Sequence, residues 1–281
     1  MLRALSLALP FAALAAPTIT SSVTRLSAPY ASTRVAWSGV PAPSSSDWIA
    51  VFCSGGTYFY WVYATGAPAG SVGMQLFANA PGSGCTSLTL SYYHGSSILM
   101  SSAPIPIDPM IQQMRLSLTS DPTAMVVDFV STAGGAAPAC RYGASVGALT
   151  RSAPANASAI ATIGNVSHAL LEGLEPGQRV FYACGDSAAQ SAVYNFTAGA
   201  LPAASGEGVR VAVFADMGVN DAFGLQQIAD DAAAGLFDFA IHSGDMAYNL
   251  ESENSANGNF FMNRAMLYAA NQPLQPACGN Q

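Results

Sequence analysis

The spacing of the apolar residues changes once along the chain, and this change is the strongest constraint on the fold. Before residue 198 the apolar runs are short, rich in aromatic residues and interrupted by Gly, Ser and Pro. After a segment of Ala, Gly, Pro and Ser at 198–208, longer apolar runs alternate with helical patterns. Short runs between turn residues are typical of antiparallel strands, whereas alternating strands and helices predict a parallel sheet. The sequence therefore predicts two kinds of architecture joined by a linker.

The region before residue 107 predicts a β-sandwich. The runs at 47–52, 58–63 and 87–93 are rich in aromatic and β-branched residues and are bounded by turn residues. Such runs favour strands, and none of them has a helical period. We expect their aromatic side chains to form core and cross-strand pairs rather than a ligand platform. The sequence thus predicts a β-rich region at 17–106.

A second β-sandwich is predicted at 107–200. Strand patterns continue at 113–118 and 125–130. Leu174-Glu175-Pro176-Gly177 then forms a turn that leads into a strand containing an aromatic residue. This arrangement suits the corner of a fibronectin-type sandwich. We therefore interpret 107–200 as a fibronectin III-like domain.

The remaining residues, 209–281, predict an α/β unit. Apolar runs at 209–215 and 236–242 predict strands buried on both faces, and a third strand is expected at 274–278. Helical patterns lie between them, at 222–234 and 258–271. The β-α-β-α-β order implies a parallel sheet, and such sheets bind ligands at the carboxyl ends of their strands.

The N-terminus predicts a secreted protein. Residues 1–16 combine Arg3 with a short apolar stretch and an Ala-x-Ala exit, which is typical of a cleaved signal peptide. The stretch is shorter than the about 20 apolar residues of a bilayer span, and a retained N-terminal anchor is the alternative interpretation. Three Asn-x-Ser/Thr sequons, at Asn156, Asn165 and Asn195, agree with a secretory route and with a glycoprotein. We expect no membrane contact beyond this signal peptide.

The cysteines and charges exclude several classes of function. Five cysteines lie far apart without a Cys-x-x-Cys pair, which predicts one or two disulfides and at least one unpaired thiol. The chain contains no lysine, so it holds neither a Walker-type phosphate loop nor a Schiff base. Its net charge of −7 leaves no basic patch for a nucleic-acid partner.

Polar side chains follow each predicted strand of the α/β unit. Asp216 comes directly after the first strand, and Asp245 follows the second. Tyr248 lies three residues beyond Asp245, and Asn280 follows the third strand. If the first two strands are neighbours, their carboxylates meet at one edge of the sheet, where a bound cation relieves their repulsion. The phenolate suits a trivalent metal, and the amide oxygen could bind a second metal. The sequence therefore predicts a metal centre at this edge.

These motifs resemble those of a known family. Asp216-Met217-Gly218, Gly244-Asp245-x-x-Tyr248 and Gly279-Asn280 resemble, in order, the opening motifs of the purple acid phosphatases in the calcineurin-like metallophosphoesterase superfamily. Upstream segments, including 116–123 and 174–182, resemble the N-terminal sandwich regions of the large members. The resemblance implies a multi-domain chain: an all-β sandwich (fibronectin III-like) N-terminal region followed by the beginning of an α/β metallophosphoesterase domain.

The resemblance also implies a chemistry. Asp245 would bridge two metals, Asp216 and Tyr248 would hold iron(III), and Asn280 would bind a divalent metal, namely iron, zinc or manganese. The implied activity is that of a secreted acid phosphatase, a hydrolase of small phosphate monoesters, and a homodimer is compatible with it. We expect His242 to be a strand residue near the site rather than a ligand.

The end of the sequence departs from the family pattern. Family members follow Gly-Asn with His-Glu, and Gln281 stands in place of that general-acid histidine. The later histidine ligands of the family are also absent from these residues. We therefore expect a C-terminal truncation, no catalytic general acid, weak metal occupancy and little hydrolysis by this chain alone. Two alternatives remain: a related phosphodiesterase or nucleotide pyrophosphatase, and a secreted β-sandwich binding module with a vestigial phosphoesterase tail.

Overall fold

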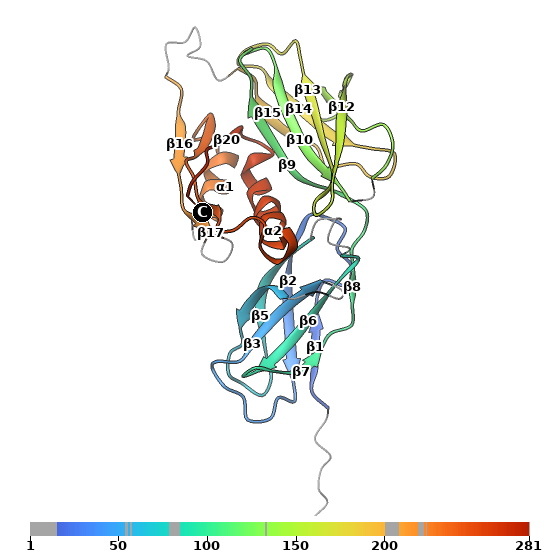
Figure 1. The fold of residues 1–281 in the computed structure, drawn as a ribbon, viewed down its shortest axis with the longest axis vertical. Helices are drawn as coiled ribbons and strands as arrows, with labels where there is room; N and C mark the ends of the chain where they lie inside the picture. The colour runs from blue at the N-terminus through green and yellow to red at the C-terminus, as the bar shows by residue number, and fades with distance from the viewer. Residues whose placement is uncertain are drawn as a thin grey trace, which may run out of the picture.

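Two β regions and a smaller α/β region make up the protein (Figure 1). The computed structural model describes residues 16–280 except 54, 55, 57, 79–84, 133, 200–207, 219–221 and 223. The expected signal peptide lies almost wholly outside the described residues, as do most of the expected linker and Gln281. Among the described residues, no helix is both long and apolar enough to cross a membrane.

The first β region consists of two antiparallel sheets. One has the strand order β1-β2-β5 and the other β4-β3-β6-β7, with β8 paired to β6. Their bounds are β1 Thr18–Ser21, β2 Tyr30–Ser38, β3 Trp48–Cys53, β4 Tyr58–Tyr63, β5 Gly70–Phe77, β6 Ser87–His94, β7 Ser97–Ser101 and β8 Ile105–Pro106. Alternate residues face the core, as Ile49 and Val51 of β3 and Leu88 and Leu90 of β6 show, since all four are fully buried.

The second β region is one folded antiparallel sheet with the strand order β15-β14-β11-β12-β13-β10-β9. Its bounds are β9 Ile111–Leu118, β10 Met125–Ser131, β11 Ala139–Gly143, β12 Arg151–Ile160, β13 Gly164–Leu171, β14 Arg179–Gly185 and β15 Tyr194–Thr197. The first half of β12 pairs with β11 and its second half pairs with β13. This long strand therefore joins the two halves of the sheet around a core that includes Phe129, Tyr182 and Phe196.

Each β region contains one disulfide. Cys53 is bonded to Cys85 in the first, and Cys140 to Cys184 in the second. Cys140 and Cys184 are opposite one another in the β11–β14 pair. Cys278 is free and exposed. The expectation of one or two disulfides with a thiol left over is confirmed, and the bonds fit an extracellular protein.

The α/β region has the predicted β-α-β-α-β order. Strands β16 Val211–Phe214, β18 Phe239–His242 and β20 Leu274–Pro276 form a parallel sheet in that order, and helices α1 Leu225–Ala233 and α2 Ser252–Ala269 connect them. Strand β20 lies at an edge of this sheet.

Two details of the α/β region differ from expectation. Strand β16 was expected to be buried on both faces, but Val213 is 65% exposed, because β16 is the outermost strand and the described residues cover only one of its faces. Helix α2 begins at Ser252, six residues before the expected start at 258. The expected start relied on an apolar period, which the polar first turn of this helix lacks.

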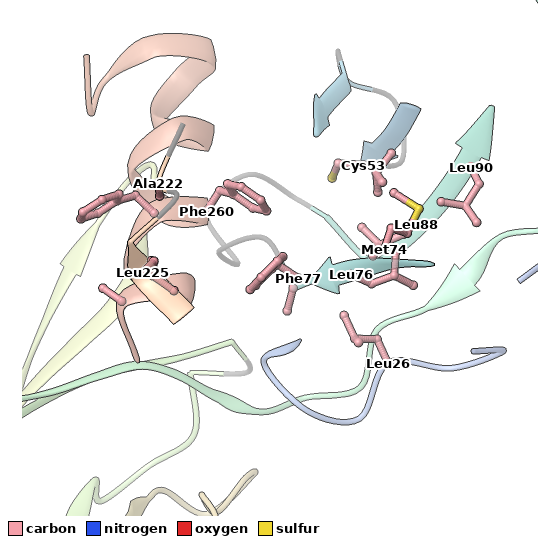
Figure 2. Packing of buried hydrophobic residues seen from close by; sticks show 14 of the residues in the cluster. Leu26, Cys53, Met74, Leu76, Phe77, Leu88, Leu90, Ala222, Leu225 and Phe260 are labelled. Carbon is pink, nitrogen blue, oxygen red and sulfur yellow. The ribbon is translucent and has the colours of Figure 1, made fainter. Parts of the chain in front are cut away.

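Helix α2 contacts both β regions. Its Phe260 packs edge-to-face on Phe77 of β5, with ring centroids 4.7 Å apart, and lies 5.4 Å from the ring of Tyr60 on β4. Figure 2 shows Phe260 facing Phe77, with Leu76 and Met74 beyond it. Toward the helix end, the Ala270 carbonyl accepts a hydrogen bond from the Tyr182 hydroxyl at 2.6 Å. A helix buried on several sides in this way fixes the position of the loop that precedes it.

A β-bulge makes a buried polar contact with α2. The pairing of β9 with β10 shifts between Asp128 and Val130, and Gln113 has a φ of 53°. The extra residue turns two successive glutamines toward the helix. The Gln113 side chain donates to Asn259 at 3.1 Å, and Asn263 donates to Gln112 at 2.9 Å. The bulge thus lets two adjacent residues of β9 form hydrogen bonds with two residues one turn apart on α2.

Candidate metal centre

A short pair of parallel strands places the two aspartates at equivalent positions in neighbouring strands. Strands β17 Met217–Gly218 and β19 Met246–Ala247 pair with Met217 opposite Met246. Asp216 and Asp245 directly precede these paired residues, beyond the carboxyl ends of β16 and β18. The Asp216 amide donates to the Gly244 carbonyl at 3.2 Å. The parallel sheet therefore positions both loops at the same edge, where the sequence predicted a site.

Tyr248 and Asp216 are in direct contact. The Tyr248 hydroxyl donates to Asp216 Oδ1 at 2.8 Å. Asp216 is exposed and Tyr248 is half-buried, so the pair is open to solvent on one side. Two oxygen ligands that occupy adjacent octahedral positions about 2.1 Å from one cation lie about 3.0 Å apart. The contact therefore has the spacing that a shared cation requires.

Asp245 and Asn280 are joined through the backbone. The Asn280 amide donates to Asp245 Oδ1 at 2.7 Å. Two glycines permit this approach. A Cβ at Gly279 would collide with Asp245, and one at Gly244 would lie 2.8 Å from the Gly279 Cα. The structure thus brings the predicted residues together as two contacting pairs, Asp216 with Tyr248 and Asp245 with Asn280.

Several non-glycine residues of these loops have left-handed backbone conformations. Their φ angles are 56° at Asp216, 52° at Asp245, 62° at Ala247, 44° at Tyr248 and 69° at Asn249. Such conformations cost free energy in L-residues, and they cluster at functional sites where the surrounding structure holds them. The sequence did not predict this strain, because Ala and Tyr carry no signal for it. Among non-glycine residues, Asn and Asp tolerate the left-handed conformation best.

His242 is a buried neighbour of the site. It is the last residue of β18, as expected, and it is fully buried between Phe214 and Phe261, whose rings are 5.1 and 5.9 Å away. Neither ring nitrogen has a hydrogen-bond partner among the described residues. Burial lowers the pKa of His242, against an opposing effect of Asp216. Burial therefore disfavours the charged form of this imidazole.

The donor set fits a hard cation. Asp216, Asp245 and Tyr248 offer oxygen donors, and the Asn280 side chain adds an amide oxygen. Oxygen donors suit hard metal ions. Within the part of the chain that the structure describes, no group of three or more His, Cys, Asp or Glu side chains could hold a metal. The oxygen donors that the structure brings into contact are thus those of Asp216 with Tyr248 and of Asp245 with the Asn280 backbone.

Comparisons with known proteins identify the second β region. Residues 111–198 match the family described as Purple acid Phosphatase, N-terminal domain. Acid phosphatase type 7 of Mus musculus is 32% identical over 176 residues, which cover 60% of this chain and 40% of the relative. Acid phosphatase type 7 of Danio rerio is 29% identical over 185 residues, covering 63% of this chain and 41% of the relative. The chain thus spans less than half the length of these relatives.

A solved structure shares the whole fold. Purple acid phosphatase PPD1 isolated from yellow lupin (Lupinus luteus) seeds superposes with a TM-score of 0.72, covering 94% of this chain and 57% of that chain at 18% sequence identity. At this identity the likeness concerns the fold alone, and it extends over both β regions and the α/β region. Residues 111–198 therefore match a purple acid phosphatase N-terminal domain, and the relatives and the shared fold together support a purple acid phosphatase N-terminal region in this chain.

Proposed function

We propose that this chain contributes the first ligands of the binuclear metal centre of an acid phosphatase that hydrolyses phosphate monoesters. The contact between Tyr248 and Asp216 is the observation that carries this proposal, because a phenol and a carboxylate at this spacing can bind one cation together. The relatives named acid phosphatase support it. In this proposal, 209–281 is the beginning of a metallophosphoesterase domain.

The ligands divide between two ions. Asp216 and Tyr248 would hold iron(III), Asp245 would lie between the ions, and Asn280 would bind the divalent ion, which would be iron, zinc or manganese. When bound, such a pair of ions polarises the phosphoryl oxygens of a monoester and lowers the pKa of a water nucleophile. A secreted protein would meet small phosphate esters outside the cell, and the two disulfides agree with that location.

The residues of this chain have defined roles in that scheme. The hydrogen bond from Tyr248 orients the Asp216 carboxylate before an ion arrives. The Asn280 amide does the same for Asp245, and Gly279 leaves room for that carboxylate. Because α2 begins four residues after Tyr248 and is buried against both β regions, the loop is anchored at its far end. Ligands held in this way need little rearrangement to bind.

Iron binding tests the proposal on this chain directly. The purified protein is mixed with iron(III) and zinc, desalted, and analysed for metal content and visible absorption. We expect bound iron with a tyrosinate-to-iron charge-transfer band, and we expect the Tyr248→Phe variant to lose the band. Tyr63→Phe is the matched control, because Tyr63 is an exposed tyrosine of the first β region. It should keep the band.

Two results would contradict the proposal. One is a charge-transfer band that persists in Tyr248→Phe. The other is iron retention by an Asp216→Asn variant that equals retention by the unaltered chain. Phosphate release from p-nitrophenyl phosphate at acidic pH supplies a second readout, and Asp245→Asn should abolish whatever release the protein supports, because this residue would contact both ions.

A further inference from the structure

The outer face of one sheet in the first β region carries exposed aromatic rings that its core does not use. Tyr63 of β4, Trp48 of β3, Tyr93 of β6 and Ile98 of β7 are cross-strand neighbours, so they form one row across the sheet. Tyr63 is 61% exposed and Ile98 is 53% exposed. The buried residues of the same strands, such as Ile49, Leu90 and Met100, face the core instead. Exposed apolar rows of this kind mark binding surfaces.

Three of the side chains form a corner beside this row. The rings of Trp48 and Trp61 meet at 74° with centroids 6.1 Å apart, and those of Trp61 and Tyr63 meet at 81° with centroids 4.8 Å apart. Together with Ser46 they line a shallow pocket of about 290 Å³. The pocket therefore offers ring surfaces in two orientations and polar edges from an indole N–H and two hydroxyl groups.

The corner is rigid before any ligand binds. The Trp48 indole donates to the Gly95 carbonyl at 3.1 Å and stacks on Tyr93, with centroids 4.0 Å apart and planes 14° apart. On the inner side of the sheet, Asp47 accepts hydrogen bonds from the Tyr92 hydroxyl and from the Ser44 amide. These contacts hold Trp48 in place, and the Trp61 ring packs against Trp48. Pre-organised aromatic groups lose little entropy when they bind.

The absence of charge indicates the kind of ligand. Strands β3, β4, β6 and β7 contain no Asp, Glu, Lys or Arg. The nearest carboxylate, Asp47, is fully buried, and its hydrogen bonds, which include one with His94, lower its pKa against the effect of burial. A cationic ligand would find no free counter-charge on these strands, and the one side chain of these strands that can become cationic, His94, is paired with Asp47. A neutral ligand complements this face.

We propose that this aromatic face, defined as Trp48, Trp61, Tyr63 and Tyr93, binds a neutral glycan. A pyranose ring presents C–H groups on its faces and hydroxyl groups at its edges. The C–H face can stack on one ring of the corner while the hydroxyls reach the polar edges and Ser46. The cross-strand row that leads to Ile98 offers a contact surface for further sugar residues of the glycan.

The aromatic face is separate from the candidate metal centre. Tyr60 of β4 packs against Phe260 of α2, whereas Tyr63 lies three residues, about 10 Å, further along the strand. In Figure 1, β3 and β7 lie in the half of the molecule away from β16 and β20. Glycan binding would therefore hold the protein at a polysaccharide surface without covering Asp216 or Asp245.

The test uses titration of the full chain with cellohexaose, chitohexaose and laminarihexaose, followed by tryptophan fluorescence and calorimetry. The chain has 3 tryptophans, and two of them lie on the aromatic face, so the fluorescence reports on it directly. We expect saturable binding of at least one hexaose, weakened by about tenfold or more in Trp61→Ala and Tyr63→Ala. Leu236→Ala, which changes an exposed apolar residue of the α/β region, should bind normally.

Several outcomes would overturn the proposal. They are no saturable binding of any hexaose, binding that Trp61→Ala leaves intact, saturable binding of choline in preference to sugars, and concentration-dependent self-association that Trp61→Ala abolishes. Circular dichroism of the variants keeps loss of fold distinct from loss of binding. Should Trp61→Ala fail to fold, Tyr63→Ala provides the same comparison, because its side chain is mostly exposed.

Discussion

The sheets of the antiparallel β regions and the sheet of the parallel α/β region are stabilised in different ways. In the β regions, alternating residues fill a core from both sheets or sheet halves, and a disulfide closes each one. In the α/β region, three strands form the sheet, and its outer strand leaves Val213 largely exposed. Left-handed backbone conformations gather in the loops at the end of this sheet.

This difference indicates which regions bury most of the apolar surface that drives folding. The β regions contribute most of the buried apolar surface, and α2 attaches the α/β region to them through Phe260 and Ala270. A strained loop persists only when its surroundings hold it in place. The candidate metal centre is therefore built on the part that buries fewer apolar side chains and is attached through α2 to the parts that bury more. Each of the following changes tests one side of this comparison.

The largest effect is expected from Phe260→Ala. This change removes a fully buried ring between α2 and the first β region, so we expect a loss of about 4 kcal/mol in the free energy of unfolding. Urea denaturation followed by fluorescence should show the α/β region unfolding before the β regions. Leu236→Ala is the matched control, since Leu236 is 58% exposed. An unchanged single transition for Phe260→Ala would contradict the anchoring role of α2.

The double change Cys140→Ser and Cys184→Ser should destabilise the second β region by about 3 kcal/mol. The bond closes a loop with a sequence separation of 44, and opening it restores conformational entropy to the unfolded chain. Thermal unfolding by calorimetry measures the loss. Cys278→Ser, which alters the free exposed thiol, should leave the transition where it was. Equal effects of the two changes would show that the disulfide does not stabilise this region.

Asp186→Asn should cost about 2 kcal/mol at neutral pH, because the buried carboxylate accepts hydrogen bonds from Ser131 and from the amides of Gly135, Ala188 and Ala189. Burial alone would raise the pKa of Asp186, but these hydrogen bonds lower it below 3.8. A lowered pKa contributes stability above about pH 4 that is lost as the pH falls through the folded-state value.

The difference between Asp186→Asn and the unaltered protein should therefore narrow below pH 4. Urea midpoints measured from pH 7 to pH 3 test this directly. A gap that stays constant with pH would mean that the charge of Asp186 contributes nothing, and that only the shape of the side chain matters.

The smallest effect is expected from Gly235→Ala, at about 1 kcal/mol of destabilisation. Gly235 follows α1 with a φ of 66°, and a Cβ there would meet no atom within 4 Å, so the cost is backbone strain alone. Gly147→Ala is the control, because it also has open space and lacks a positive φ. If both variants unfold at the same urea concentration, the strain argument fails for this loop.

The sequence predicted the fold more fully than the site. Alternation and turn residues located the strands, and the β-α-β-α-β order was right because buried parallel strands leave continuous apolar runs. Strand order predicted that Asp216 and Asp245 follow neighbouring parallel strands, which the pairing of β16 with β18 shows, and Tyr248 is hydrogen-bonded to Asp216. The exposure of Val213 could not be predicted, because an apolar run looks the same on an edge strand and on a central one.

Two further features lay beyond the sequence. The aromatic runs gave the core pairs correctly, as buried Tyr92 shows, but the same alternation placed Trp61 and Tyr63 on the outer face. Which face is covered depends on the second sheet rather than on the strand itself. The buried contact between Gln113 and Asn259 depends on a bulge, which has no signature in a run of polar and apolar residues.

That bulge has a consequence for how this protein tolerates changes in length. Removing Gln113 would make β9 a regular strand, with Gln112 still opposite Val130 and Ile111 still opposite Ser131, so both residues would keep their sides of the sheet. The hydrogen bond from Asn263 to Gln112 would remain, and the bond between Gln113 and Asn259 would be lost. A single-codon deletion at this position should thus be less damaging than one elsewhere in β9, where the residues on one side of the deletion would change faces. Replacement of Gln113 by glycine should also leave the course of β9 little changed, because its φ of 53° suits glycine.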